Sequence, residues 1–354
     1  MMAAGIAAAD VTFSGTANFG YNDTDHKTGE SVGAAFSNID LNIGFSQELN
    51  NGFTAGASVE LDYADANQGN DISASDALVS LTNGESGIYY GDTDHAAENA
   101  WTAVGSMDND SFRDADGEMV TRADMTFGGA KIGISLGDDS NYTVTAASRS
   151  TPAVMGNEKD YISLGISGSA GAFSYALAHQ NANTLWLDGD DNTAPSQLAT
   201  TGVRVSTTLG GTTVALGYTK NNNGGSTGIE VSYPMGALTT TASYVQEGAT
   251  GAENNWDVKF VYAADAVGLT VATDESQDWN VDVSYEMGNG LSLFVGADDG
   301  GEDTYAGVSY DLGGGASMLA SYANDNDNDD DDDDDDVGAK DYKEGMTFQL
   351  SFAF

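Results

Sequence analysis

The last ten residues of the chain, 345–354, read GMTFQLSFAF, and they decide the fold class. Met346, Phe348, Leu350, Phe352 and Phe354 alternate with small or polar residues, and a period of two is typical of an extended strand. A soluble sandwich also alternates in this way, but it rarely leaves a run of Phe side chains uncovered at its end. The pattern therefore predicts a strand with one face in lipid, the closing strand of a membrane β-barrel.

Composition agrees with a barrel. The chain has 354 residues, with 45 Gly and only 3 Pro, which suits many tight turns between unbroken strands. Lys+Arg total 11 against 55 Asp+Glu, so a nucleic-acid partner is disfavoured by phosphate repulsion and attraction of cations is favoured. The absence of Cys excludes disulfides, thiolate metal sites and a cysteine nucleophile.

No segment has the roughly 20 apolar residues that a spanning helix needs. The least charged segment, residues 161–187, alternates and is interrupted by a Ser-Gly-Ser-Ala-Gly turn, so it predicts a hairpin. Residues 1–9, MMAAGIAAA, look like the remnant of a secretory signal peptide, although a plain N-terminal tail is the alternative. We expect residues 10–354 to form one domain.

Alternating segments follow one another in pairs along the whole chain. Short turns such as Asn50-Asn51-Gly52 join each pair, and longer, acidic loops separate the pairs. Short periplasmic turns and long extracellular loops are typical of an outer-membrane antiparallel β-barrel. Counting gives about twenty strands, with ambiguity at residues 88–90 and 142–149. Tyrosines at the strand ends on the apolar face predict two aromatic girdles: Tyr63, Tyr218, Tyr244 and Tyr322 before long loops, and Tyr233, Tyr285 and Tyr310 before short turns.

Four features together resemble a known family. They are AAADVTFSG at residues 7–15, Tyr90-Gly91-Asp92 before a long third loop, YDLGGGAS at residues 310–317, and the C-terminal Phe354. The sequence is similar to the general-diffusion porins of Gram-negative outer membranes, of the alphaproteobacterial Rhodobacter-type branch. The resemblance implies an all-β barrel of sixteen strands, a homotrimer, an inward-folded third loop, and a terminal Phe354 recognised by the barrel-assembly machinery. The strand number stays open between sixteen and twenty.

The third loop, residues 92–118, is acidic. If it folds inward as the resemblance implies, it lines the constriction with carboxylates; an ordinary solvated outer loop is the alternative. The candidate constriction residues are Asp92, Asp94, Glu98, Asp108, Asp110, Asp114, Asp116 and Glu118.

Alternation also places a few charges on the inner face of the barrel wall. Arg122, Arg204 and Lys259 each precede their following turn by six residues, and Glu230 and Asp282 share that level. Basic residues across from an acidic loop would set a transverse field, although each could equally form a simple salt bridge within the lumen. Because only three basic residues lie on this part of the wall and acidic residues share their level, we predict that the channel prefers cations.

An acidic run lies inside the last loop, residues 324–341. Its adjacent carboxylates repel one another and supply no core, so a solvated disordered loop is one interpretation. Diffuse binding of Ca²⁺ or Mg²⁺ that bridges lipopolysaccharide is the other, and no cofactor is required. The run does not match a helix-loop-helix calcium loop. The candidate residues are Asp329, Asp330, Asp331, Asp332, Asp333, Asp334, Asp335 and Asp336.

Enzymatic signals are absent from the sequence. The three His residues are scattered, and there is no G-x-S-x-G elbow and no phosphate-binding loop. The sequence therefore predicts a passive, water-filled channel in the outer membrane, surrounded by lipid and lipopolysaccharide. A substrate-selective channel is the near alternative. A secreted, acidic, calcium-binding β surface protein is a remote one, and it would be expected to carry a fixed glycine-aspartate repeat that we do not find.

Overall fold

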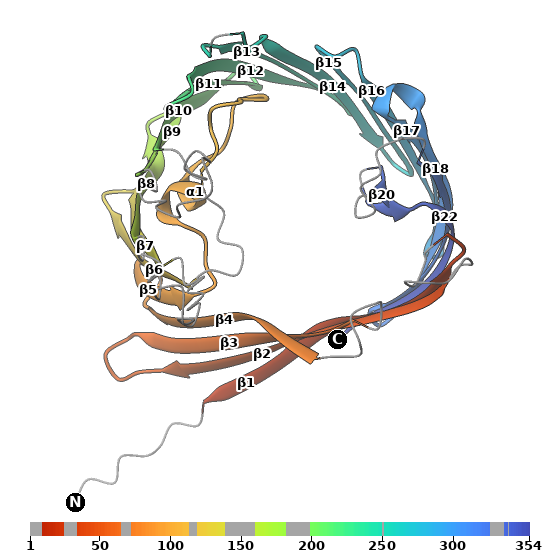
Figure 1. Cartoon of the computed structure of the whole chain (residues 1–354), viewed down its shortest axis with the longest axis horizontal. Helices are drawn as coiled ribbons and strands as arrows, with labels where there is room; N and C mark the ends of the chain where they lie inside the picture. The colour runs from red at the N-terminus through yellow and green to blue at the C-terminus, as the bar shows by residue number, and fades with distance from the viewer. Residues whose placement is uncertain are drawn as a thin grey trace, which may run out of the picture.

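The computed structural model describes residues 9–24, 34–64, 72–112, 119–138, 160–181, 199–249, 251–325, 336–338 and 340–354. Within them, one 20-stranded antiparallel sheet closes into a barrel (Figure 1). The expected signal remnant, apart from Ala9, and the ambiguous segment 142–149 lie outside the described residues.

The barrel strands follow the order of the sequence. They are β1 (Asp10–Asn22), β2 (Ala34–Glu48), β3 (Thr54–Ala64), β4 (Ile72–Thr82), β5 (Ser86–Gly91), β6 (Met119–Phe127), β7 (Ala130–Asp138), β8 (Asp160–Ala170), β9 (Phe173–Gln180), β10 (Thr200–Leu209), β11 (Thr212–Lys220), β12 (Gly225–Met235), β13 (Leu238–Glu247), β14 (Asn255–Ala264), β15 (Val267–Asp274), β16 (Trp279–Gly288), β17 (Leu291–Asp298), β18 (Asp303–Gly313), β19 (Ala316–Asn324) and β22 (Gly345–Ala353). The remaining elements are α1 (Ala96–Ala100), η1 (Asp299–Gly301), β20 (Asp336–Val337) and β21 (Tyr342–Lys343).

Closure joins the first strand to the last. β1 pairs with β2 on one side and with β22 on the other, where Thr16 lies opposite Ala353 and Asn22 opposite Thr347. The count of about twenty strands is therefore confirmed, and the sixteen implied by the resemblance is not the number in the described chain. The physical reason is that every alternating segment, including the short β5, finds two neighbours in the sheet.

The short turns follow from Gly at positions of positive φ. Gly128 and Gly129, between β6 and β7, have φ of 61° and 85°, and Gly210 and Gly211 repeat this pair between β10 and β11. Two successive residues in the left-handed region are what a two-residue hairpin loop requires, and Gly adopts it without steric cost. The turns thus fix the register of the hairpins.

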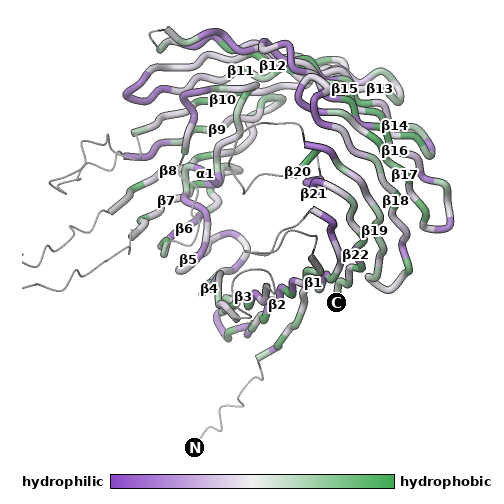
Figure 2. Tube along the Cα trace, turned by 45° about the vertical axis from the view of Figure 1, so that its right-hand side comes forward, coloured by the Kyte–Doolittle hydropathy of each residue, from purple (hydrophilic) through white to green (hydrophobic). Residues whose placement is uncertain are grey.

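The apolar face of the strands points outward. In β22, Phe348 is 53% exposed, whereas the neighbouring Thr347 is 3% exposed and faces the interior. Figure 2 shows hydrophobic and hydrophilic residues alternating along β2 and β3. Among the described residues, no helix has the length and hydropathy to span a bilayer. The outer face, rich in exposed apolar side chains, is therefore the surface suited to lipid.

Tyrosines lie on this outer face close to the strand ends. Tyr218, Tyr244 and Tyr322 are exposed near the loop end, and Tyr233, Tyr285 and Tyr310 are exposed near the turn end, whereas Tyr63 is half-buried. This placement is the one that aromatic girdles at two membrane surfaces require.

Candidate functional site

Two elements lie inside the ring. One is the segment of residues 92–112, here the inner loop, which leaves β5, forms α1 and follows the wall past β7–β13 (Figure 1). The other is the pair β20 and β21, here the inner hairpin, which lies by β16–β19 on the other side of the interior. Both narrow the interior of the barrel, so they define the candidate site.

Small hydroxyl groups on the wall hold the start of the inner loop. His95 is 1% exposed, and its Nδ1 lies 3.2 Å from the Ser135 Oγ. The backbone N–H groups of Ala96 and Ala97 donate to the Oγ atoms of Ser135 and Ser163, each at 3.0 Å. These bonds satisfy buried backbone donors at the first turn of α1, which otherwise have no partner.

Glycines on the inner face let the loop approach the wall. A Cβ at Gly165 would lie 1.9 Å from the carbonyl oxygen of Ala96, and one at Gly217 would lie 2.8 Å from both Val104 and Met107. At Gly165 the contact is with backbone, which cannot move aside without displacing the loop, so a side chain there is excluded; at Gly217 a Cβ would force Val104 and Met107 to shift. The glycine lane consists of Gly133, Gly137, Gly165, Gly202, Gly217 and Gly228.

The end of the inner loop is held by a small core and a polar network. Val104 and Met107 pack against Ala215 and Val245 of the wall. Beyond them, the Glu247 carboxylate accepts from the Asn109 Nδ2 at 2.8 Å and from the backbone N–H of Asp108 at 3.1 Å. The loop is thus anchored to the wall along its described length.

The position of Arg122 corrects an expectation. We expected it to face the acidic loop across the pore, but it lies beneath the loop on the same wall. Its Nη1 donates to the carbonyl oxygen of Asp94 at 2.7 Å, its Nε lies 3.4 Å from an Asp124 oxygen, and its Cζ is 4.9 Å from the Tyr89 ring centroid. The reason is that the loop docks on β6–β13, the sector that contains Arg122.

None of the described acidic residues of the loop is buried, although the Asp108 Oδ1 accepts from the Asn255 Nδ2 of β14 at 2.7 Å. Asp94 and Asp108 are exposed, and Asp92, Glu98 and Asp110 are half-buried. Asp114, Asp116 and Glu118 lie outside the described residues. The fully buried positions of the loop are neutral or apolar, whereas its described carboxylates keep some exposure to the interior.

Among the loop carboxyls that the structure describes, Asp110 has a raised pKa. Burial raises its pKa above the ordinary 3.8, and the carboxylates of Glu247 and Asp108 raise it further. A hydrogen bond from the Trp101 Nε1, at 3.2 Å, acts in the opposite direction because it stabilises the charged form.

The other four predicted wall residues lie on the inner face but are spread around it. Arg204 donates to the Ser206 Oγ at 3.3 Å, and Glu230 is paired across the sheet with Ala215, which packs under the inner loop. Lys259 lies two residues from Asp257 and therefore on the same face of β14. The Asp257 carboxylate accepts from the Ser243 hydroxyl, and Ser243 lies next to Gly105 of the inner loop. Asp282 accepts from the Tyr305 hydroxyl behind the inner hairpin. No ion pair joins any two of the predicted wall residues, so they do not form one basic cluster.

An acidic strip on β2 and β3 was missed in the sequence. Asp40 lies opposite Asp62, next to Glu60, and its Oδ2 accepts from the Thr16 Oγ1 at 2.8 Å. Strands β1–β5 contain no Lys or Arg, so no neighbouring strand of this sector neutralises the strip. The sequence contains a signal for this strip. Leu41 and Leu61 point outward, so the adjacent Asp40 and Asp62 must point inward.

An aromatic cluster holds the inner hairpin to the wall. Val337 and Tyr342 pack with Tyr305 and Ala323, and burial raises the pKa of Tyr342 to about 12, so its hydroxyl stays neutral. Of the candidate metal residues, Asp336 belongs to β20, and Asp329–Asp335 lie outside the described residues. Among the residues that the structure describes, no cluster of three acidic or His side chains could hold a metal ion.

Comparison with known proteins assigns the family. The model of a Gram-negative porin family matches residues 1–333, and the chain therefore belongs to that family. A double mutant of the Rh. blastica porin is similar to this chain, with 12% identity, a TM-score of 0.50, and coverage of 98% of this chain and 100% of that one. A triple mutant of the Rhodopseudomonas blastica porin has 13% identity and a TM-score of 0.49 over the same shares. No curated protein matches the sequence significantly.

Family membership makes this protein an outer-membrane diffusion channel and not an enzyme. The likeness to the blastica double mutant, at low identity, shows the shared barrel fold.

Proposed function

We propose that this channel is water-filled and prefers cations over anions. The observation that carries the proposal is the imbalance of charge on the inner face. Asp40, Asp62, Asp94 and Asp108 present carboxylates to the interior, whereas two of the inner cations, Arg122 and Lys131, are both tied to Asp124, at 3.4 and 3.6 Å. An excess of fixed negative charge raises the local concentration of cations and lowers that of anions.

A reversal potential across a KCl gradient tests the preference. The channel, reconstituted in a planar bilayer, is expected to show the sign of K⁺ selectivity, and the selectivity should decline as salt is raised because exposed charges are screened. A reversal potential of the opposite sign would refute the proposal. The same record measures conductance, so a chain that forms no pore is recognised separately.

We further propose that the channel is a homotrimer in contact with lipid and lipopolysaccharide, and that Phe354 is a signal for the barrel-assembly machinery. The exposed Phe354 side chain supports the second point, because its backbone is already paired with Gly15, at 2.9 and 3.0 Å, while its ring stays free to be recognised. Deletion of Phe354 is expected to lower the amount of assembled barrel in cells, and unchanged assembly would contradict this.

Diffuse binding of Ca²⁺ or Mg²⁺ by Asp329–Asp336 remains a proposal from the sequence alone. Isothermal titration of the folded protein, compared with a variant that lacks residues 326–335, tests it. Equal uptake of divalent cations by the two proteins would dispose of the idea.

A further inference from the structure

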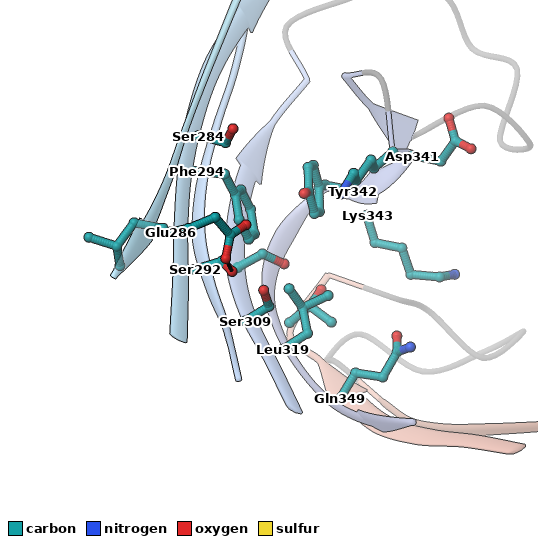
Figure 3. A pocket seen from close by; sticks show the side chains of 14 residues that line it. Ser284, Glu286, Ser292, Phe294, Ser309, Leu319, Asp341, Tyr342, Lys343 and Gln349 are labelled. Atoms are coloured by element: carbon teal, nitrogen blue, oxygen red, sulfur yellow. Dashed lines mark hydrogen bonds between the residues drawn. The ribbon is translucent and has the colours of Figure 1, made fainter. Parts of the chain in front are cut away.

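A cavity of about 610 Å³ lies between the inner hairpin and the wall (Figure 3). Side chains of β16–β19 and β22 form one side, and residues 340–343 form the other. The volume lies within the range of small-molecule sites in proteins. The cavity is separate from the inner loop and from the acidic strip, so neither of these accounts for it.

The cavity has fixed walls. Tyr342 stacks on Phe294, with ring centroids 4.6 Å apart and an interplanar angle of 8°, and its centroid lies 4.9 Å from that of Tyr305. Stacked, buried rings hold the hairpin in one position relative to β17 and β18. A preformed cavity does not have to be ordered when a solute enters, which favours binding.

The two ends of the cavity differ in charge. At one end Glu286 accepts from the Ser292 Oγ at 2.5 Å, and at the other Lys343 extends from the hairpin toward the side of Gln349 (Figure 3). The Lys343 Nζ lies 5.7 Å from the Phe36 ring centroid, and in the described part of the chain neither Lys343 nor Lys340 forms an ion pair. Asp341 points away from the wall in Figure 3. One end therefore attracts a carboxylate, and the other accepts hydrogen bonds from hydroxyl groups.

A buried hydroxyl in the cavity lacks a partner. Ser321 is 5% exposed, and its Oγ makes no hydrogen bond within the described residues. A buried hydroxyl without a partner costs free energy, which a bound solute that offers a hydroxyl group would recover. This observation is independent of the charges at the cavity ends.

We propose that this cavity binds a small polyhydroxylated carboxylate, a sugar acid. Its carboxylate would lie toward Lys343 and Lys340, and its hydroxyl groups toward Glu286 and Ser321. The inference rests on the proposed function, since the solute reaches the cavity through the pore. Although the negative charge of the lumen disfavours anions in general, the two lysines provide a local site for sugar acids.

Single-channel recording with gluconate tests the proposal. Gluconate added at constant KCl is expected to produce brief current interruptions whose frequency rises with concentration and then saturates. Acetate, which has the carboxylate without the hydroxyls, and glucose, which has the hydroxyls without the carboxylate, are expected to produce none. If glucose or acetate also causes interruptions, and their frequency saturates at the same concentration as with gluconate, the assignment to sugar acids is overturned.

Two variants and a matched control localise the site. The double variant Lys340→Gln, Lys343→Gln is expected to raise the half-saturating gluconate concentration about tenfold, the loss typical of a charge-assisted hydrogen bond. Ser321→Ala should raise the half-saturating gluconate concentration several-fold, while heat-modifiable migration on a gel shows that the barrel is intact. The double variant Arg204→Gln, Lys259→Gln removes the same two positive charges from the lumen outside the cavity, so the half-saturating gluconate concentration should stay unchanged.

The outcomes separate this proposal from the proposed function. If Arg204→Gln, Lys259→Gln raises the half-saturating gluconate concentration as much as Lys340→Gln, Lys343→Gln does, the effect comes from the general field of the lumen and the site is refuted. If gluconate causes no interruption in a conducting, cation-selective channel, the site is refuted and the channel stands. Reversed ion selectivity with saturable gluconate interruptions would refute the cation preference alone.

Discussion

The Arg122 Nη1 donates to the backbone carbonyl oxygen of Asp94 at 2.7 Å, so the barrel wall and the inner loop are joined where the loop begins. The Arg122 side chain is 9% exposed and also pairs with Asp124. A basic residue that we expected to face the loop across the pore instead anchors it from below. Arg122 therefore holds the start of the inner loop against the wall.

Loss of the Arg122 anchor should loosen the inner loop. Arg122→Met removes a charge-assisted hydrogen bond, which is worth about 2 kcal/mol of docking free energy. We expect noisier single-channel currents and a lower temperature of the heat-modifiable gel shift. Arg204→Met, which removes the same charge from a residue that makes no contact with Asp94, is the control, and equal noise in both variants would contradict an anchoring role.

A side chain in the glycine lane should displace the loop. In Gly165→Val the new Cβ would meet the Ala96 carbonyl oxygen at 1.9 Å, a distance that the backbone cannot accommodate without moving. We expect an altered conductance with the barrel retained, measured in planar bilayers. Gly44→Ala is the control, because its Cβ meets only the side chain of Thr12. An equal change of conductance in both variants would refute the role of the glycine lane in docking the loop.

Docking of the loop should weaken as pH rises. Burial raises the pKa of Asp110, so docking favours the protonated acid. This contribution is fully present below the ordinary value of 3.8 and is lost as pH rises through the raised pKa. Current noise should therefore increase with pH over that window, and Asp110→Asn should abolish the change. Asp94→Asn is expected to retain it.

The acidic strip should contribute to cation preference. A charge roughly 10 Å from a permeating ion changes its energy by about 0.4 kcal/mol in water, roughly a twofold effect on permeability. Asp40→Asn with Asp62→Asn should lower the ratio of cation to anion permeability by at least that factor, measured as a reversal potential. Glu85→Gln, in an exposed turn, should leave the ratio unchanged. A ratio unaffected by the double variant would exclude the strip.

Release of the inner hairpin should widen the pore. Tyr342→Ala removes the ring that stacks on Phe294, and truncation of a buried aromatic residue costs about 3 kcal/mol. We expect a higher single-channel conductance. Tyr342→Phe keeps the ring and loses only the hydroxyl, so its conductance should match that of the unmodified channel. A conductance that is unchanged in both variants would mean that the hairpin does not obstruct ion flow.

The barrel could be predicted from the sequence because its signals are local. A period of two in residues 346–354 and paired Gly residues at turns such as Gly210-Gly211 depend only on neighbours along the chain. The inward face of Arg204 and Lys259 follows from the same alternation, and the strand count follows from the number of alternating segments.

The docking of the inner loop could not be predicted, because it depends on contacts between residues far apart in sequence. Ser135 and Gly165 have the appearance of ordinary strand residues until His95 and Ala96 are seen against them. One signal was present, since Gly recurs at inward positions of β7, β8, β10, β11 and β12. The inner hairpin was harder to predict, because Val337 and Tyr342 come after an acidic run that contains no apolar residue.

The pairing of β1 with β22 has a consequence for biogenesis. Residues from the two ends of the chain, such as Asn22 and Thr347, meet only after nearly the whole polypeptide has been made. Until that seam forms, both outermost strands expose unpaired backbone groups that invite aggregation. The ring can therefore close only once β22 is available, and the edges of the strands need protection until then.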